Sequence, residues 1–190
     1  MAPAVVAAGA IVFGMANGAI AASFAVSGSN FKVSAGSLDG TGFVQYGGVA
    51  HANVKDANGV QDHPVAVAGI PSADITNLCQ SVLVPVGGGH NISVILRAGQ
   101  NGETVHAENL MFDLTDLYAD ATFTNINIGQ DASTLTDGPS GAQGAVGGFG
   151  QQATHVTLKN VKQVAWSASA GTFELNGLEL HVSLAGEECF

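Results

Sequence analysis

The stretch VHAENLMFDLTDLYADATFTNINIGQD, residues 105–131, decides the fold class. Its first half places Leu110, Phe112 and Leu114 at alternate positions. Alternate apolar residues line one face of a β-strand, because successive strand side chains point to opposite faces. Further strand-like apolar residues follow at Leu117, Ala121, Phe123, Ile126 and Ile128. The segment therefore predicts long strands and excludes an amphipathic helix.

The flanking chain repeats this pattern in both directions. Short apolar runs alternate with turn signals such as Asn58-Gly59 and Asn101-Gly102, and Asn-Gly is a strong marker of tight turns. Strands are predicted near residues 24–26, 31–35, 64–68, 73–86, 90–98 and 155–182. We therefore expect a mainly β fold. We expect an N-terminal apolar helix, followed by a single antiparallel or solenoid-like curved β domain over residues 23–190.

A weak internal repeat marks several of these strands. The pattern apolar-x-Asn-apolar occurs at residues 75–78, 123–126 and 158–161, with looser copies around Asn109 and Asn176. Asn tolerates the left-handed backbone region that bulges and turns require. We therefore predict a curved sheet whose Asn residues lie at bends. The alternative is that a chain rich in Thr and Asn produces such matches by chance.

A Gly-, Ser- and Pro-rich segment at residues 131–150 separates two similar strand pairs. It shows no hydrophobic periodicity. A connection of this length without secondary structure is either mobile or functional. We predict a loop here and leave both roles open.

The first twenty-two residues, MAPAVVAAGAIVFGMANGAIAA, carry no charged side chain. One interpretation is a secretory signal peptide with the small-x-small site Ala19-Ile20-Ala21, cleaved before Ala22 or Ser23. The other is a retained helix of roughly 33 Å that anchors the protein in a membrane or an assembly. Small residues near one face would let such helices approach closely. These are Gly9, Gly14 and Gly18. We favour retention.

The charge excludes one class of partner. The net charge is −10, and there are only five basic residues. Nucleic-acid binding needs a basic patch to neutralise phosphates, so we expect no nucleic acid. Charged residues make up only 11% of the chain, which suits surfaces that pack on something else.

Two cysteines, Cys79 and Cys189, are the only ones in the chain. An even pair in an exported protein most often forms a disulfide, and we predict that bond here. The alternative is two buried thiols. No cysteine spacing resembles a zinc site.

Motifs for catalysis are absent from the sequence. No G-x-S-x-G nucleophile elbow occurs, and no alternation of strands and helices would support one. His106-Ala107-Glu108 matches half of a zinc-deaminase motif without its P-C-x-x-C partner. We therefore predict no catalytic residue, no cofactor and no enzymatic activity.

Three further sets of residues receive structural interpretations. A weak metal site in the loop of His51, Asp56, Asp62 and His63 is far less favoured than solvated side chains, so we expect no metal. The spacing of Asp113, Asp116 and Asp120 does not fit an EF-hand, and strand-edge carboxylates are expected. Trp166 and Tyr118 lie in apolar strands, and we expect both in the core.

Several blocks of sequence carry a resemblance. They are AASFAVSGSNFKVSAGSLDGTGFVQYGG (21–48), NLCQSV (77–82), LTDLYADATFTNINIG (114–129) and GEECF (186–190). In these blocks the chain resembles an uncharacterised family of exported proteins of filamentous actinobacteria, some of which bear the automatic label "cholesterol esterase". The resemblance implies an envelope or extracellular location and a hydrophobic N-terminal segment. It implies no established activity.

These observations together favour a structural role. We expect an exported, non-enzymatic protein that self-assembles as a homo-oligomer or filament, or is anchored in a membrane, and displays a β head. The alternative is an envelope protein that binds a lipid or sterol against a curved sheet. A secreted esterase is the least favoured hypothesis.

Overall fold

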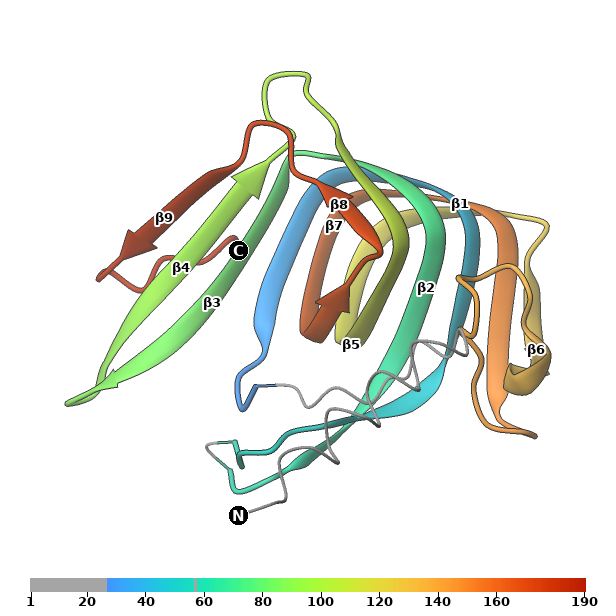
Figure 1. Ribbon diagram of the computed structural model, residues 1–190, viewed down its shortest axis with the longest axis horizontal. Coiled ribbons are helices and arrows are strands. Elements are labelled where there is room, and N and C mark those ends of the chain that lie inside the picture. The colour runs from blue at the N-terminus through green and yellow to red at the C-terminus, as the bar shows by residue number, and fades with distance from the viewer. Residues whose placement is uncertain (1–26, 57) are drawn as a thin grey trace, which may run out of the picture.

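The computed structural model describes residues 27–56 and 58–190, and within them almost all regular structure is β-sheet (Figure 1). A single 3-10 turn, η1, interrupts the strands. The elements in chain order are β1 Phe31–His51, β2 Asp62–Thr76, β3 Leu78–Gly87, β4 His90–Ala98, β5 Val105–Thr124, β6 Asn127–Asp131, η1 Ala132–Thr134, β7 Phe149–Ser169, β8 Thr172–Glu174 and β9 Glu179–Ser183.

All nine strands belong to one antiparallel sheet in the order β6-β7-β5-β2-β1-β3-β4-β9. Strand β7 also pairs with β1, so β1, β2, β5 and β7 form a closed ring of pairings. Strand β8 pairs with β5 outside this path. Strands β3, β4 and β9 extend from the ring to one side, and we call this part of the sheet the wing (Figure 1).

The predicted fold class was wrong in one respect. It combined an N-terminal apolar helix with a β domain, but the described residues form a nine-stranded antiparallel sheet and contain no α-helix. The segment 1–22, with Gly9, Gly14 and Gly18, lies outside the described residues. Nowhere in the ranges 27–56 and 58–190 does a helix have the length and apolar character to cross a membrane. Of the two predicted β architectures, the antiparallel one is observed and the solenoid is not.

Four of the five Asn residues marked by the repeat take a left-handed backbone and Asn176 does not, and the four line up across the sheet with glycines of β1 that the repeat did not mark. Asn77, Asn109, Asn125 and Asn160 all have a positive φ, between 50° and 52°. Gly36 of β1 lies opposite Asn77 on one side, because Ser37 pairs with Thr76 and Ser34 with Cys79. The neighbouring pairs place the same glycine opposite Asn160 on the other side. Gly36, Asn77 and Asn160 form the first bend row.

A second bend row crosses the sheet six residues away along each strand. Gly42 of β1, with φ of 76°, lies opposite Pro71 of β2 and Thr154 of β7. Asn109 of β5 lies opposite the other side of Pro71. Asn125 continues the row, since its Nδ2 donates a hydrogen bond to Thr154 Oγ1 at 3.2 Å. The β1–β2, β1–β7 and β2–β5 pairings keep one register, whereas the β5–β7 pairing shifts register beside Asn160, between Tyr118 and Asp120.

The inward-facing set of residues shifts by one position at each bend. In β1 the buried residues are Val33 and Ala35 before the first bend, Leu38 between the bends, and Phe43 after the second. A strict alternation would place Leu38 outside if Val33 were inside. The bend residue absorbs the extra position, much as a bulge does. The inward residues of the ring pack into one core around Leu110, Val105, Val156 and Ile75.

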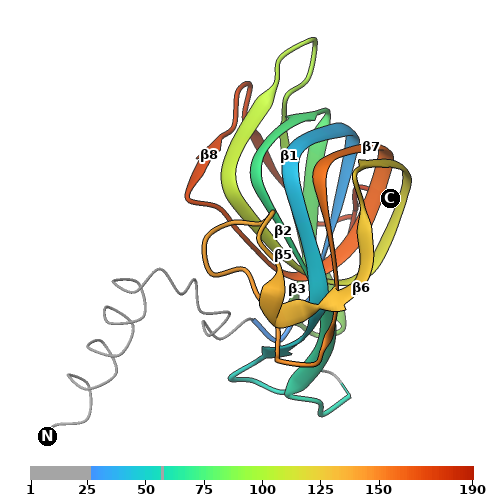
Figure 2. The same cartoon turned by 90° about the vertical axis from the view of Figure 1, so that its right-hand side faces the viewer.

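The Gly-rich segment is a packed cover over the outer face of the sheet (Figure 2). Leu135, Ala132 and Ala142 are buried there against a second apolar cluster that includes Val44. A Cβ on Gly138 would clash with the Val44 side chain, so this glycine permits the close approach. Within the predicted loop range 131–150, Asp131 ends β6, η1 spans Ala132–Thr134 and β7 begins at Phe149, and the segment buries a face of the sheet.

We predict that Gly42→Ala destabilises the protein by about 3 kcal/mol. An alanine would hold a left-handed backbone, and its Cβ would meet the backbone oxygen of Asp137 and, at 2.9 Å, the ring of Pro71. Urea unfolding followed by the fluorescence of Trp166, the only tryptophan, measures the loss. Gly47→Ala in the same strand is the control, since nothing lies within 4 Å of its Cβ. Equal effects of the two variants would contradict the bend.

Candidate functional site

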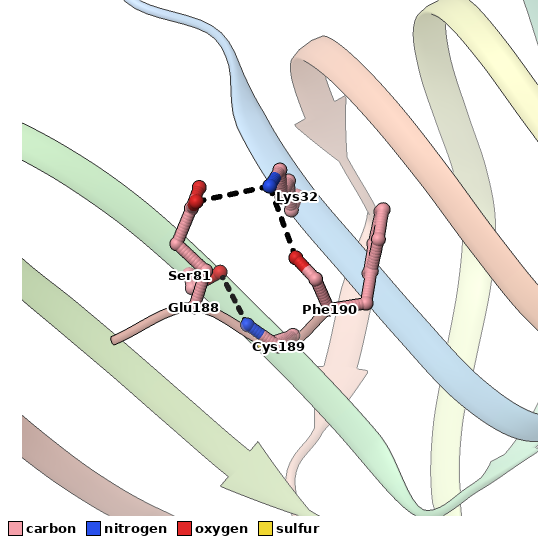
Figure 3. Close-up of polar contacts among 5 residues, drawn as sticks. All are labelled: Lys32, Ser81, Glu188, Cys189 and Phe190. Atoms are coloured by element: carbon pink, nitrogen blue, oxygen red, sulfur yellow. Dashed lines mark hydrogen bonds and ion pairs between the residues drawn. The ribbon is translucent and has the colours of Figure 1, made fainter. Parts of the chain in front are cut away.

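The C-terminal residues are clamped onto the start of the sheet. The structure joins Cys79 of β3 to Cys189 by a disulfide across 110 residues, as the sequence predicted. The backbone N–H of Cys189 donates to Ser81 Oγ at 3.0 Å (Figure 3). Lys32 Nζ lies 2.9 Å from Glu188 Oε2 and donates to the backbone oxygen of Phe190 at 3.0 Å (Figure 3). We call this set of contacts the C-terminal clamp.

The Phe190 ring extends the clamp to a third strand. Its centroid lies 5.2 Å from Lys32 Nζ of β1 and 5.7 Å from Lys162 Nζ of β7. Cations at this distance are attracted by the aromatic ring. The clamp therefore connects β1, β3 and β7 at the point where the wing leaves the ring.

The clamp covers one face of the wing and leaves the other open. On the covered face Ser81, Ser93 and Ile95 are at most 2% exposed. The opposite face carries aliphatic side chains in cross-strand rows, such as Val82–Val94–Val182 and Leu96–Leu180. We call this surface the apolar wing face. It consists of Val82, Val84, Ile92, Val94, Leu96, Leu180 and Val182.

The apolar wing face is most exposed toward its margin. Leu180 is 67% exposed and Val182 53%, whereas Val82, Val94 and Leu96 nearer the ring are partly covered. Beside β9 lies an open hollow of about 810 Å³ lined mainly by polar and charged side chains. They include Arg97, Glu179, His181, Glu187 and Glu188. Apolar and charged surfaces therefore meet at β9.

A polar row crosses the outer face of the sheet between the two bend rows. Glu174, His106, Asp74 and Asp39 are successive cross-strand neighbours on β8, β5, β2 and β1. His106 Nδ1 lies 2.8 Å from Asp74 Oδ1. This hydrogen bond raises the pKa of His106 above its ordinary value of 6.5, with help from the charges of Asp74 and its acidic neighbours. His155 Nε2 lies 3.3 Å from Asp39 Oδ2 in the same way.

The residues considered for metal binding are used otherwise. His51 pairs with Asp62 on the surface at 2.9 Å. Hydrogen bonds from the backbone N–H groups of Val60 and Asn58 lower the pKa of Asp56, which closes its own loop. His63 is buried and stacks on Trp166 at 3.6 Å between ring centroids. No group of three or more His, Cys, Asp or Glu side chains suited to a metal ion occurs in the described part of the chain.

Two of the three aspartates considered on β5, Asp113 and Asp120, also have structural partners. Ser167 Oγ donates to Asp113 at 2.6 Å, and Asn160 Nδ2 donates to Asp120 at 2.7 Å. His106 and Glu108 lie on the same face at 4.0 Å, without a metal-binding partner set around them.

Of the two aromatic residues predicted in the core, one is buried and the other is exposed. Trp166 is buried as expected, but Tyr118 is 67% exposed, and its placement in the core was wrong. Tyr118 follows the register shifts between Asp113 and Asp116 in the pairing of β5 with β7. These shifts change which face of the sheet each later side chain of β5 lies on. Sequence reasoning also missed the apolar wing face. The alternation of Leu178, Leu180 and Val182 was a usable signal, but a strand buried on that face would show the same alternation.

The sequence model of a family described as "Family of unknown function (DUF6230)" matches residues 27–190, and the chain therefore belongs to this family. No curated protein and no solved structure matches the chain.

We predict that Cys189→Ser lowers the free energy of unfolding by about 4 kcal/mol, because the bond closes a loop of 110 residues in the unfolded chain. Lys32→Met is the matched control. It removes the ion pair of the clamp, keeps the disulfide, and should cost about 1 kcal/mol or less. Urea unfolding of both variants measures the difference. A loss in Cys189→Ser no larger than in the control would contradict the constraint.

We predict that His106 stabilises the fold at acidic pH. Because its pKa is raised in the folded state, the contribution is complete below the ordinary value of 6.5 and is lost as the pH rises through the raised pKa. The stability difference between the native chain and His106→Gln should therefore be largest below the ordinary value of 6.5 and shrink as the pH rises through the raised pKa. Nuclear magnetic resonance of the ring gives a direct check, since Asp74→Asn should lower the pKa of His106. An unchanged pKa in that variant would contradict the pair.

Proposed function

We propose that this member of the DUF6230 family is a non-enzymatic structural protein of the cell envelope or extracellular space, which associates with further copies of itself. The observation that carries the proposal is the apolar wing face. Soluble monomers rarely expose contiguous apolar patches of this kind, and such patches mark interaction sites. Leu180 and Val182 lie at its margin with more than half of their surface exposed.

The wing is held as a fixed surface, which supports a role in assembly. The disulfide and the Lys32 contacts hold the covered face of the wing to the ring. A preorganised surface loses little conformational entropy when a partner binds. The exposed aliphatic side chains are therefore suited to stable packing.

An oxidising location is supported by the disulfide, since such bonds persist outside the reducing cytosol. The uncharged apolar sequence of residues 1–22 has the composition of an export or anchoring signal. The sequence blocks that resemble exported actinobacterial proteins agree with it. We place the protein in the envelope or outside the cell on these grounds.

The uses of the ionisable side chains support a non-enzymatic role. His51, His106 and His155 each pair with a carboxylate across neighbouring strands on exposed sheet surface. Asp131 accepts hydrogen bonds from the backbone and side chain of Ser133 and from the Gly147 N–H, which lower its pKa. These interactions stabilise strands and loops. None of these four side chains lines the open hollow beside β9.

A second function has support from the same surface. The apolar wing face is aliphatic apart from the neighbouring Gln80, which lies opposite Leu96, and such a surface suits the acyl chain of a lipid or the ring system of a sterol. In this alternative the protein holds a lipid at the wing. Solvent extraction of natively purified protein followed by mass spectrometry tests it, and a lipid recovered in proportion to the protein would favour it.

We predict that the native full chain forms particles of at least twice the mass of one chain, because burial of the exposed aliphatic side chains drives association. Light scattering over a range of protein concentrations in detergent-free buffer measures the mass. Leu180→Lys should shift the population toward single chains. Val146→Lys, at an exposed valine in the Gly-rich segment, should not. A single-chain mass at every concentration would contradict self-association.

A further inference from the structure

Strand β9 is an open edge of the sheet. It pairs with β4 on one side, from Ser93–Ser183 to Arg97–Glu179, and it ends the strand order. Figure 1 shows β9 at the margin of the wing, with no other described strand beyond it. Alternate backbone N–H and C=O groups of an edge strand point outward unpaired, and they form a template for another strand.

We propose that β9 pairs antiparallel with β9 of a second copy of this chain, around a two-fold axis beside His181. The inference rests on the proposed self-association and identifies its interface. All five residues of β9 then pair, with His181 opposite His181 and Leu180 opposite Val182 of the second copy. Full overlap gives this register more backbone hydrogen bonds than a shifted one.

The apolar side chains agree with this register. Leu180 and Val182 continue the rows of Leu96 and Val94 on the apolar wing face. In the paired wings, the row that ends in Leu180 meets the Val182 row of the second copy, and the row that ends in Val182 meets its Leu180 row. Opposite aliphatic residues on neighbouring strands stabilise pairing, and here they are the most exposed residues of the face.

The charged side chains select the antiparallel orientation. Parallel pairing in full register would place Glu179 opposite Glu179, and like charges directly opposite are destabilising. In the antiparallel register Glu179 lies opposite Ser183 and diagonal to His181 of the second copy. Diagonal neighbours are within reach of long side chains. Both residues border the open hollow beside β9, which leaves room for this contact.

The other sheet ends are less suited to pairing. Strand β6 carries a pairing irregularity between Ile128 and Gln130 and a positive φ at Gly129, and bulges of this kind disrupt edges. Strand β8 has only three residues. In contrast, β9 pairs with β4 without a register shift, and Ser93 Oγ donates to the Ser183 backbone oxygen at 3.4 Å. Among the described edges β9 is therefore the one prepared for a partner.

Single cysteines introduced into the full chain test the interface. His181→Cys places two cysteines directly opposite each other, at a Cα separation of about 4.5 to 5.5 Å that a disulfide can bridge. Both native cysteines are already paired, so the new thiol is the only free one. We expect mild oxidation at about pH 8 to convert most His181→Cys chains to a covalent dimer on a non-reducing gel.

Glu179→Cys is the matched control, since its partner in the proposed register is Ser183. Alone it should cross-link at least fivefold less than His181→Cys, and a mixture with Ser183→Cys should restore cross-linking. Intact mass and unfolding of each variant confirm that the native disulfide and the fold are kept. Equal cross-linking at positions 179 and 181, or none at 181 and none in the mixture, would overturn the interface.

The same experiment separates this inference from the proposed function. If light scattering shows assemblies but His181→Cys does not cross-link within them, the β9 interface is wrong and self-association stands. If the chain is a single copy at every concentration and no cross-link forms, both are wrong.

Discussion

Neighbouring strands of the ring bend in shared rows, and this constraint governs the rest of the structure. A bend in one strand alone would break the hydrogen bonds to its neighbours, because paired strands must follow the same path. Here Asn77 and Asn160 lie on either side of Gly36, and their backbones take the left-handed conformation that Asn tolerates. Gly36 leaves the space that the neighbouring side chains fill, as an added Cβ would lie 2.9 Å from Asn77 Nδ2.

The aligned bends explain how a single sheet encloses a core. Because the inward set shifts by one residue where a strand crosses a bend row, apolar side chains remain inside along strands of 15 to 21 residues. The ring of β1, β2, β5 and β7 can then bury Leu110 and Val156 completely. The Gly-rich segment covers part of the outer face. The apolar side chains of that face, such as Val44 and Val67, would otherwise be exposed to water.

The wing is the part of the sheet that the ring cannot bury. It continues from β2 past Asn77, and no strand or helix of residues 27–56 and 58–190 forms a second layer on its apolar face. The C-terminal clamp stabilises it from the other face and ties the chain's last residues to β1 and β3. A surface that is rigid, aliphatic and bordered by an open strand edge is better suited to a protein or lipid partner than to catalysis. The function we propose follows from this difference between the two faces.

The sequence by itself determined the local features of this protein. Apolar alternation placed most strands, and the repeated apolar-x-Asn-apolar pattern marked Asn77, Asn109, Asn125 and Asn160 as bends, since a left-handed backbone is a preference of the residue itself. With only two cysteines, it also determined the disulfide partners. Only the tertiary structure decided which strands pair, how the ring closes, that Tyr118 is exposed, and that β9 is left at an edge. These depend on contacts between distant segments and on one-residue shifts in pairing, and neither leaves a local signal in the chain.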